Sequence, residues 1–394
     1  MTFVSDNVLI KTVRSIEEIG EEAWSRAVQA APGEADNPFL TYGFLHSLEV
    51  SGSVGEQTGW VPFHLVMADG DGQTLGLAPQ YLKTHSYGEY VFDHAWADAY
   101  ERAGGRYYPK LQISIPFTPA SGRRFLVPPG PDREARERAL ALGATKVAEE
   151  AGVSSLHTTF IDKDSATRLA RINDGSVFLK RTDQQFHWEN RDYNSFDGFL
   201  SDLASRKRKN IRKERAQALS DGVTIRWLKG AEITEAHWDA FFDFYMDTGA
   251  RKWGTPYLTR EFFSEAGTRM GDKVLLFLCE RNGTPIGGAL NFVGSDTLYG
   301  RYWGAREHQS CLHFEACYYQ AIDYAIEHKL RFVEAGAQGP HKLARGYLPV
   351  TTMSLHWVRD PGFREAIARY LEVEREDVDR ANAMLAAHGP FKKS

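Results

Sequence analysis

Residues 278–303 read LCERNGTPIGGALNFVGSDTLYGRYW, and residues 65–92 read LVMADGDGQTLGLAPQYLKTHSYGEYVF. Each stretch begins with an apolar strand, turns at an Asn-Gly or Asp-Gly pair, and continues as a second strand with a glycine at its middle. Each then has a polar turn and a strand that contains Tyr-Gly. The repeated order predicts two copies of one α/β unit, with two unrelated hairpins as the alternative.

Helical and extended periodicities alternate through the rest of the chain. Apolar residues at helical spacing predict helices over residues 17–30, 132–151, 196–219, 238–249, 259–270, 314–329 and 363–388. Apolar or alternating runs predict strands over residues 61–68, 74–82, 155–161, 223–228, 273–280, 285–293, 297–303, 330–335 and 350–357. The break between the copies is expected between residues 178 and 196, which gives an N-terminal unit, 1–185, and a C-terminal unit, 186–394.

Length and composition narrow the class of protein. The 394 residues exceed twice the ~150 of a typical domain, which supports two domains. A net charge of −5 weighs against a globally basic nucleic-acid binder, and 42% hydrophobic residues predict a folded chain. Three cysteines make no disulfide framework, and no apolar segment follows a basic head at the start. Because the longest apolar run, 274–279, is far shorter than the ~20 residues that span a bilayer, we expect a cytoplasmic protein without a membrane span.

The segment from Arg206 to Arg215 carries seven positive charges and one negative charge in ten residues. So many like charges on one helix repel one another, which predicts a polyanionic partner such as a pyrophosphate, a nucleotide-linked substrate or tRNA. Arg208, Lys209 and Arg212 are the candidate phosphate-binding residues. The alternative is a solvated helix whose cations pair with nearby acids.

A small-residue loop that follows the expected strand 330–335 is dense in cationic and proton-transferring groups. Strand ends are where α/β folds bind ligands. Glu334 or His341 could take a proton from an attacking amine, and Lys342 and Arg345 could hold a carbonyl or phosphate oxygen. The alternative is a glycine turn with surface charges.

A second candidate pair, His313 and Glu315, opens the helix expected over 314–329. A carboxylate at a helix entry can hold a substrate ammonium, but it repels a phosphate. The loop before it, 305–312, contains no glycine. We therefore expect no pyrophosphate binding at this helix.

Aromatic and polar residues supply the remaining candidates for substrate binding. Tyr302 and Trp303 end the strand 297–303, and Asp93 and Tyr108 belong to a ring-rich polar wall in the first half. No metal site is expected, because the chain has no HExxH or CxxC pair. Phosphate-binding glycine loops and the Gly-x-Ser-x-Gly motif are also absent, which argues against kinase, ATPase, dinucleotide-binding and serine-hydrolase functions.

Several segments together resemble the FemAB-like group of predicted N-acyltransferases, labelled peptidoglycan biosynthesis/recognition, within the GNAT superfamily. The resemblance covers nearly the whole chain. It is carried in the first half by residues 85–93, 107–111 and 116–119, and in the second half by residues 205–215, 251–258, 287–291, 298–304, 312–315, 317–319, 336–339 and 341–342.

This resemblance implies an α/β fold with tandem GNAT-like domains, each a mixed, mostly antiparallel sheet flanked by helices. It also implies transfer of an acyl or aminoacyl group to an amine, with aminoacyl-tRNA or acyl-CoA as co-substrate and no tightly bound cofactor. The acceptor in Fem enzymes is a nucleotide- or lipid-linked peptidoglycan precursor, so an anionic substrate and tRNA are the implied partners. The sequence assigns no oligomeric state.

Two departures from the related enzymes bear on this expectation. Pro340 precedes His341 where the family pattern has a glutamate, so an acid function at that position is lost or moved. The chain also lacks the glycine-containing loop by which acetyl-CoA-dependent GNAT enzymes hold the cofactor pyrophosphate. Both departures leave open a degenerate GNAT pair that binds an anionic glycan precursor or RNA without catalysis. An acetyl-CoA enzyme with its site in the first half is a third possibility.

Overall fold

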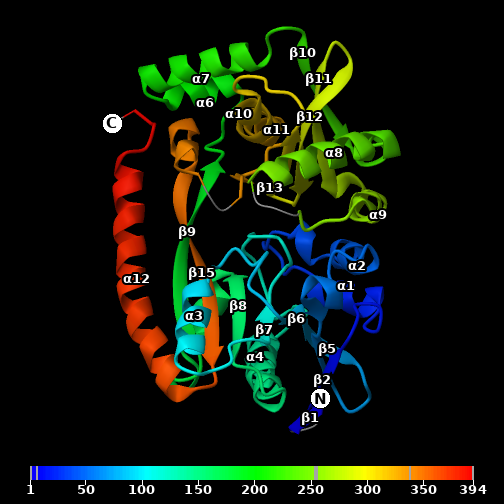
Figure 1. The fold of residues 1–394 in the computed structure, drawn as a ribbon, viewed down its shortest axis with the longest axis vertical. Coiled ribbons are helices and arrows are strands. Elements are labelled where there is room, and N and C mark those ends of the chain that lie inside the picture. Colours follow the sequence, from blue (N-terminus) through cyan, green and yellow to red (C-terminus); the bar gives the residue numbers. More distant parts are fainter. Residues whose placement is uncertain (1, 6–7, 253–255, 337–338, 393–394) are drawn as a thin grey trace. The chain divides into compact units, whose positions relative to one another are not determined.

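The computed structural model describes residues 2–5, 8–252, 256–336 and 339–392, and Figure 1 shows the course of the chain. Two of the segments that carry the family resemblance lie partly outside these residues, at 253–255 and at 337–338. None of the helices in the described part of the chain combines the length and the apolar character that a bilayer crossing requires.

The chain divides into two compact units. Unit 1 contains Met1–Asp183 and Thr351–Arg380, and unit 2 contains Gln184–Val350 and Ala381–Ser394. The first boundary lies close to the one expected at residue 185. Residues 351–380, which the linear division assigns to the C-terminal unit, group with unit 1. The chain passes between the units within strands β9 (Leu179–Glu189) and β15 (Leu348–Val358) and within helix α12 (Pro361–Ala387).

Unit 1 contains two mixed or antiparallel sheets. One has the strand order β1-β2-β4-β5 and the other β15-β8-β7-β6-β3. All described pairings in them are antiparallel except that of β7 with β8. The strands are β1 (Thr2–Ser5), β2 (Val8–Val13), β3 (Trp60–Pro62), β4 (His64–Ala68), β5 (Thr74–Ala78), β6 (Gln80–Lys83), β7 (Lys110–Ile113) and β8 (Ser155–Ile161).

Helix α4 forms much of the core of unit 1. Its buried residues Leu140, Ala144 and Val147 belong to one hydrophobic cluster with Leu111 and Leu156 of the sheet. Burial of such side chains is the main stabilising term in folding. The helices of the unit are α1 (Glu21–Val28), α2 (Tyr42–Val50), α3 (His94–Arg102), α4 (Arg133–Glu150) and α5 (Lys163–Leu169).

Unit 2 is built on a sheet with the order β10-β11-β12-β13-β14-β9. Only the pairing of β13 with β14 is parallel. The three strands expected over 273–280, 285–293 and 297–303 are confirmed. The strands are β10 (Val223–Lys229), β11 (Val274–Arg281), β12 (Thr284–Val293), β13 (Thr297–Ala305) and β14 (Phe332–Glu334).

Helices of unit 2 bury their apolar faces in one cluster with this sheet. Phe199 and Tyr324 of the helices share it with Phe277, Leu298 and Val333 of the strands. The helices are α6 (Phe196–Asp202), α7 (Ser205–Ala218), α8 (Glu235–Lys252), α9 (Arg260–Met270), α10 (Leu312–Phe314) and α11 (Gln320–Glu327), with a π-helical segment, η6 (Glu315–Tyr319), and a 3₁₀ segment, η7 (Pro340–Arg345).

The prediction of one long helix over 196–219 is wrong, because the helix breaks between α6 and α7. Leu203 and Ala204 have extended backbone angles. Leu203 forms a bridge with Phe391, and the Ala204 amide donates to the Pro390 carbonyl at 2.9 Å. Pairing with the end of the chain therefore replaces the helical hydrogen bonds at this point, and local periodicity carries no signal of it.

The prediction of a Tyr-Gly strand in the first half is also wrong. Residues 84–93 contain turns and bends but no strand. The Tyr87 carbonyl accepts hydrogen bonds from Trp60 Nε1 at 3.1 Å and from Lys83 Nζ at 3.3 Å. These side chains satisfy the backbone oxygen that a neighbouring strand would otherwise satisfy.

Candidate functional site

A pocket in unit 2 begins where β13 and β14 part. The two strands pair in parallel from Thr297 and Phe332 as far as Tyr299 and Glu334. Strand β14 ends at Glu334, whereas β13 continues to Ala305. The side of β13 beyond residue 299 is therefore left without a strand neighbour from β14.

A β-bulge shapes this part of β13. Against β12, Leu290 pairs with Tyr302 and Asn291 pairs with Gly300, so Arg301 is an extra residue. Bulges bend a strand and redirect its side chains, and they are common next to functional sites. Here the bulge interrupts the alternation of side chains between Gly300 and Trp303.

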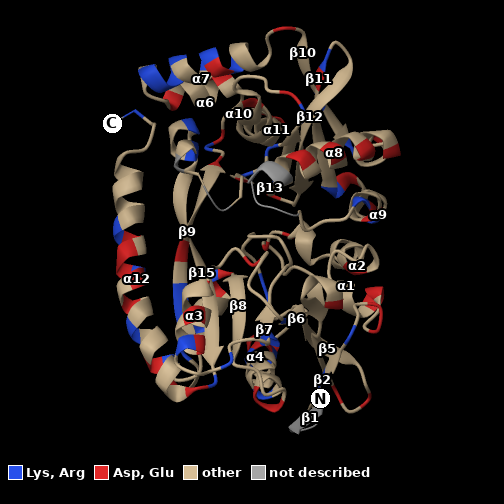
Figure 2. Cartoon of the chain, viewed as in Figure 1, with Lys and Arg blue, Asp and Glu red and all other residues tan. Residues whose placement is uncertain are grey.

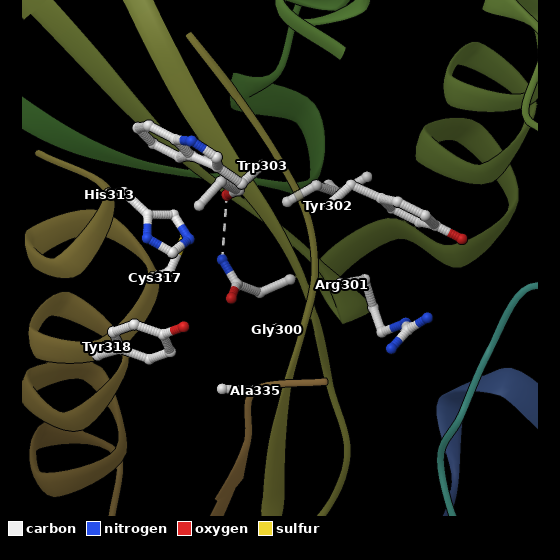
Figure 3. A pocket seen from close by; sticks show the side chains of 11 residues that line it. Gly300, Arg301, Tyr302, Trp303, His313, Cys317, Tyr318 and Ala335 are labelled. Carbon is white, nitrogen blue, oxygen red and sulfur yellow. Dashed lines mark hydrogen bonds between the residues drawn. The ribbon is translucent and has the colours of Figure 1, made fainter. Parts of the chain in front are cut away.

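The pocket has an empty volume of about 380 Å³, which includes its open mouth. Its walls come from β12, β13, the helix that follows them and the residue after β14 (Figure 3). They are formed by Ala289, Leu290, Asn291, Gly300, Arg301, Tyr302, Trp303, His313, Cys317, Tyr318 and Ala335. Of the residues expected to bind or transform substrate, Tyr302, Trp303 and His313 thus share one cavity.

A π-helical turn supplies the helical wall. The helix expected over 314–329 is α10, η6 and α11, with η6 wound as a π-helix. π-Helical turns are rare in proteins overall, but those that occur are often found at functional sites. His313, Cys317 and Tyr318 line the pocket, whereas Tyr319 donates a short hydrogen bond to Glu214 of α7. Nothing in the sequence indicates this turn, and Cys317 and Tyr318 are not among the predicted site residues.

His341 and Lys342 of η7 adjoin the pocket through its lining residues. The Tyr318 hydroxyl and His341 Nε2 are 2.9 Å apart. Lys342 is 1% exposed, and its Nζ donates to the Gly336 carbonyl at 2.6 Å. Burial, reinforced by the positive charge of Arg301, lowers the pKa of Lys342 to about 7. A buried amine that is partly neutral near physiological pH is an unusual group for a purely structural role.

Glu334 lies at the end of β14 with a side chain that is 14% exposed. Its Oε1 is 3.7 Å from His187 Nε2. Burial, together with the charge of Lys342, lowers the pKa of His187 to about 3, so this histidine is neutral and does not form a charged pair with Glu334. Glu334 and His341 both remain candidates for the proton acceptor.

Two further predicted catalytic residues are engaged in ion pairs with α7. Glu315 is fully buried, and its Oε1 lies 2.9 Å from Arg215 Nη2. Burial raises the pKa of Glu315 against the opposing charge of Arg215. Arg345 Nη2 lies 2.8 Å from Glu214 Oε2, and its guanidinium stacks on the Phe314 ring. These contacts fix α7 to η6, which lines the pocket, and to η7, which adjoins it.

The opposite face of α7 carries the basic segment, and Figure 2 shows Lys and Arg gathered along this helix. Arg208 Nη1 lies 3.5 Å from three carbonyl oxygens at the end of α6. Arg212 pairs with Asp197 at 2.8 Å but is 57% exposed. Among the described residues, no carboxylate lies within ion-pair distance of Arg206, Lys209 or Lys213, all of which are exposed. The helix therefore presents cations that its own acids do not neutralise.

Asp93 and Tyr108 belong to a buried polar cluster in unit 1. Asp93 accepts hydrogen bonds from Lys110 and, at 2.7 Å, from the Tyr107 hydroxyl. Tyr108 and Ser86 share a hydrogen bond of 2.8 Å. Asp93 is 2% exposed, which leaves it little access to a substrate.

Two more ionisable groups complete this cluster: Glu89, which belongs to the predicted polar wall, and Lys83, which the sequence analysis does not single out. Lys83 and Glu89 are both buried, and Glu89 pairs with Lys110 at 2.7 Å. Burial lowers the pKa of Lys83 to about 6 and raises that of Glu89 to about 7. Burial by itself would raise the pKa of Asp93, but the positive charge of Lys110 holds that pKa well below its usual range. A lysine in a short strand gives no local indication that it will be buried.

No group of three or more His, Cys, Asp and Glu residues in the described part of the chain is arranged to hold a metal ion. None of the three cysteines forms a disulfide among the described residues, and Cys317 is the one that lines the pocket. The pocket thus offers proton-transferring, cationic and aromatic groups.

Comparison with known proteins agrees with this architecture. Residues 15–393 match the model of a family described as FemAB-like, peptidoglycan biosynthesis/recognition. No curated protein matches the sequence.

Among solved structures, FemX is similar with a TM-score of 0.55 at 12% identity, over 89% of this chain and 98% of that one. A conserved protein of unknown function from Bacteroides thetaiotaomicron is similar with a TM-score of 0.51 at 11% identity, over 89% and 100% of the two chains. A tandem GNAT protein from the clavulanic acid biosynthesis pathway has a TM-score of 0.47 at 14% identity, over 90% and 99%. The predicted fold class is confirmed as far as the architecture goes: the chain has two α/β units with mixed, mostly antiparallel sheets flanked by helices, and FemX shares this fold.

Proposed function

The chain belongs to the FemAB-like family of peptidoglycan biosynthesis/recognition, and from that premise we propose that it is an N-acyltransferase. It transfers an acyl or aminoacyl group from an activated donor, aminoacyl-tRNA or acyl-CoA, to an amine acceptor of the peptidoglycan-precursor type. The observation that carries the proposal is the pocket at the parting of β13 and β14, with a buried lysine of lowered pKa beside it.

The reaction is a direct attack of an amine on the donor carbonyl. A C–N bond forms, and the C–O bond of an aminoacyl ester or the C–S bond of a thioester breaks. The leaving oxygen or sulfur takes the electron pair of the broken bond and gains a proton, to give the free tRNA hydroxyl or CoA thiol, while the amine loses one proton. His341 is placed to receive that proton through Tyr318, because the two side chains are within hydrogen-bond distance and His341 is exposed. Lys342 in its protonated form stabilises the negative charge that develops on the carbonyl oxygen.

The basic face of α7 supports a polyanionic donor or acceptor. Arg208, Lys209 and Arg212 bind phosphates in this proposal, and the uncompensated cations Arg206 and Lys213 extend the surface. Glu214 and Arg215 connect the same helix to the segments beside the pocket. A polyanion bound to α7 would therefore be held by a helix that also contacts the site. Aminoacyl-tRNA is the favoured donor, because the sequence lacks the pyrophosphate loop of CoA-dependent enzymes.

A binding protein without catalytic activity is the second candidate. One observation favours it: Glu315 and Arg345, two of the expected catalytic residues, are engaged in intramolecular ion pairs. Such a protein binds an anionic glycan precursor or RNA and forms no product with any acyl donor.

A ligand panel with a product assay tests the proposal. The melting temperature is measured with acetyl-CoA, longer acyl-CoAs, charged tRNA and UDP-linked peptidoglycan precursors, since a ligand that binds the native state raises it. Product formation is followed by mass spectrometry for each donor and acceptor pair. Stabilisation by tRNA or the UDP-linked precursors, with a new amide product, supports aminoacyl transfer. Stabilisation by CoA compounds alone would identify the donor as an acyl-CoA thioester. Binding without product for every donor would support a binding protein without catalytic activity.

A further inference from the structure

Asn291 presents an unused hydrogen-bond acceptor to the pocket. Its side chain is fully buried within β12 and lines the cavity. Its Nδ2 donates to the Ala289 carbonyl at 3.0 Å and approaches the Leu275 carbonyl at 3.5 Å. Because both neighbours are acceptors, the amide orientation is fixed, with nitrogen toward the carbonyls and Oδ1 on the other side.

No donor among the described residues reaches Asn291 Oδ1. Gly300 lies next to it, since a Cβ on that residue would stand 3.4 Å from Oδ1, in van der Waals contact. A buried acceptor without a donor is costly, and native proteins rarely leave one. Gln80 and Gln112 also have unpartnered buried amide oxygens, but neither lines this pocket. Asn291 Oδ1 is thus an acceptor for which the cavity can supply a partner from outside.

The charges around the pocket select the kind of donor. Arg301 lines it, and Lys342 lies close enough to Arg301 for their charges to interact. A second cation is disfavoured in such surroundings, whereas a neutral amine is not. A carboxylate has no proton to donate and would meet the lone pairs of Oδ1. Trp303, whose ring centroid lies 5.5 Å from that of His313, offers apolar ring surface for the carbon chain next to the amine, whereas the Tyr302 ring points the other way and packs on Tyr245 of α8 (Figure 3).

We propose that the pocket is the amine subsite of unit 2 and that Asn291 Oδ1 accepts a hydrogen bond from a neutral primary amine. This inference rests on the proposed acyltransferase function and names the acceptor end of its site. Binding the amine in its neutral form leaves the nitrogen lone pair available for attack, and the bond to Oδ1 orients it. The lowered pKa of Lys342 shows how the same surroundings act on a primary amine.

Trifluoroethylamine is the probe, because its amine is largely neutral at neutral pH and its fluorines report binding by ¹⁹F NMR. Ethylamine, which is protonated at that pH, and trifluoroacetate, which donates no proton, are the matched ligands. Trifluoroethylamine is expected to bind the full-length protein more tightly than either. Equal or tighter binding of ethylamine would make the pocket an ammonium site, and preferential binding of trifluoroacetate would make it an anion site; either result overturns the proposal.

Three variants locate the contact. Asn291→Leu is expected to weaken trifluoroethylamine binding about fivefold or more, the effect of one lost hydrogen bond. Gly300→Ala keeps Asn291 and covers Oδ1 with a methyl group, so it should weaken binding as well, and it remains informative if Asn291→Leu does not fold. Gln112→Leu removes an equally unpartnered buried amide in unit 1 and should leave binding unchanged. Unchanged binding in Gly300→Ala and in a folded Asn291→Leu contradicts the proposal.

The same variants separate this inference from the proposed function. If no donor gives a product but Asn291→Leu still abolishes amine binding, the transferase function fails and the amine subsite stands. If product forms and neither variant changes the KM for the amine, the transferase function stands and the subsite is elsewhere.

Discussion

Tyr318 connects the pocket to the surface, because its hydroxyl meets His341 and its ring lines the cavity. Burial raises the pKa of Tyr318, so the hydroxyl stays protonated and can pass a proton without carrying a charge. The proposed proton transfer through Tyr318 therefore depends on the hydrogen bond between its hydroxyl and His341, which a single substitution removes.

Tyr318→Phe is expected to lower kcat about tenfold to a hundredfold with little change in KM, because it breaks a proton path and leaves the ring in place. Glu334→Gln should keep kcat within about twofold if His341 is the acceptor. Tyr324→Phe is the control, because the Tyr324 hydroxyl lies outside the pocket and is buried without a hydrogen-bond partner. A large loss in Glu334→Gln with full activity in Tyr318→Phe would move the acceptor to Glu334. Initial rates over a range of amine concentrations decide between them.

Lys83 makes the stability of the protein depend on pH. Its folded-state pKa is lowered from 10.5 to about 6, so between these values the unfolded chain binds more protons than the folded one. Stability from this group is then fully present above pH 10.5 and is lost as the pH falls toward 6.

Lys83→Met removes that dependence while preserving much of the side-chain volume. Relative to the wild type, the variant should be most favoured near pH 6 and should lose its advantage as the pH rises toward 10.5. Urea denaturation at a series of pH values measures this difference. Lys163→Met, at an exposed position of α5, serves as control. A pH-independent difference for Lys83→Met would show that Lys83 is charged in the folded protein.

At the scale of elements, helix α7 has two working faces. Its outer face carries Arg206, Lys209 and Lys213, which have no described carboxylate within ion-pair distance. Its inner face carries Glu214 and Arg215, which pair with η7 and η6. One helix can therefore bind a polyanion and support the pocket wall at once. Each face makes its own prediction.

Loss of the inner contact should destabilise the protein. Arg215→Met leaves the fully buried Glu315 without its principal cation and is expected to cost about 3 kcal/mol of unfolding free energy. Adding Glu315→Gln removes the stranded charge and should recover a large part of that loss. Denaturant titrations of both variants measure it. If the double variant is no more stable than Arg215→Met, the charge of Glu315 is not the source of the cost.

Loss of the outer cations should weaken the salt dependence of polyanion binding. Lys209→Gln with Lys213→Gln is expected to reduce the slope of log affinity against log salt by about 0.7 to 0.9 for each lost phosphate contact. Charged tRNA is the probe, measured by fluorescence anisotropy at several salt concentrations. Lys146→Gln with Lys163→Gln removes two exposed cations from unit 1 as control. Equal slopes for both double variants would place the polyanion elsewhere.

At the scale of the whole molecule, the two units are not consecutive segments of the chain. Strand β15 pairs with β8 through Met353 and residues 355–358, so the sheet of unit 1 is completed by residues from the far end of the sequence. Unit 1 lacks one of its strands in any fragment that ends near residue 185.

A fragment of residues 1–185 is therefore expected to be largely unfolded or aggregated, because β8 becomes an unpaired edge. A fragment in which residues 1–183 are joined by a flexible linker to residues 351–380 should regain cooperative unfolding. Circular dichroism melting of the two fragments compares them. A cooperative transition in the shorter fragment would support the linear division at residue 185.

The α/β class and the central strands of unit 2 could be predicted from the sequence alone. Hydrophobic periodicity and turn residues are local properties, so strands such as β11, β12 and β13 lie close to their predicted bounds. The concentration of cations on α7 is equally visible in one dimension. The family resemblance, carried by short segments, then supplied the tandem arrangement.

Which of the candidate residues lie together could be learned only from the three-dimensional structure. The local sequence around Glu315 does not indicate that it pairs with Arg215, 100 residues away. The local sequence around Lys83 does not indicate that this residue is buried. The break at Leu203 depends on its bridge with Phe391, and the unpartnered acceptor of Asn291 is apparent only once its place beside the pocket is known. Burial and ion pairing depend on neighbours that are distant in the sequence. A charged group or a carbonyl oxygen has its pKa or hydrogen-bonding strength altered by desolvation only when those neighbours exclude water from it.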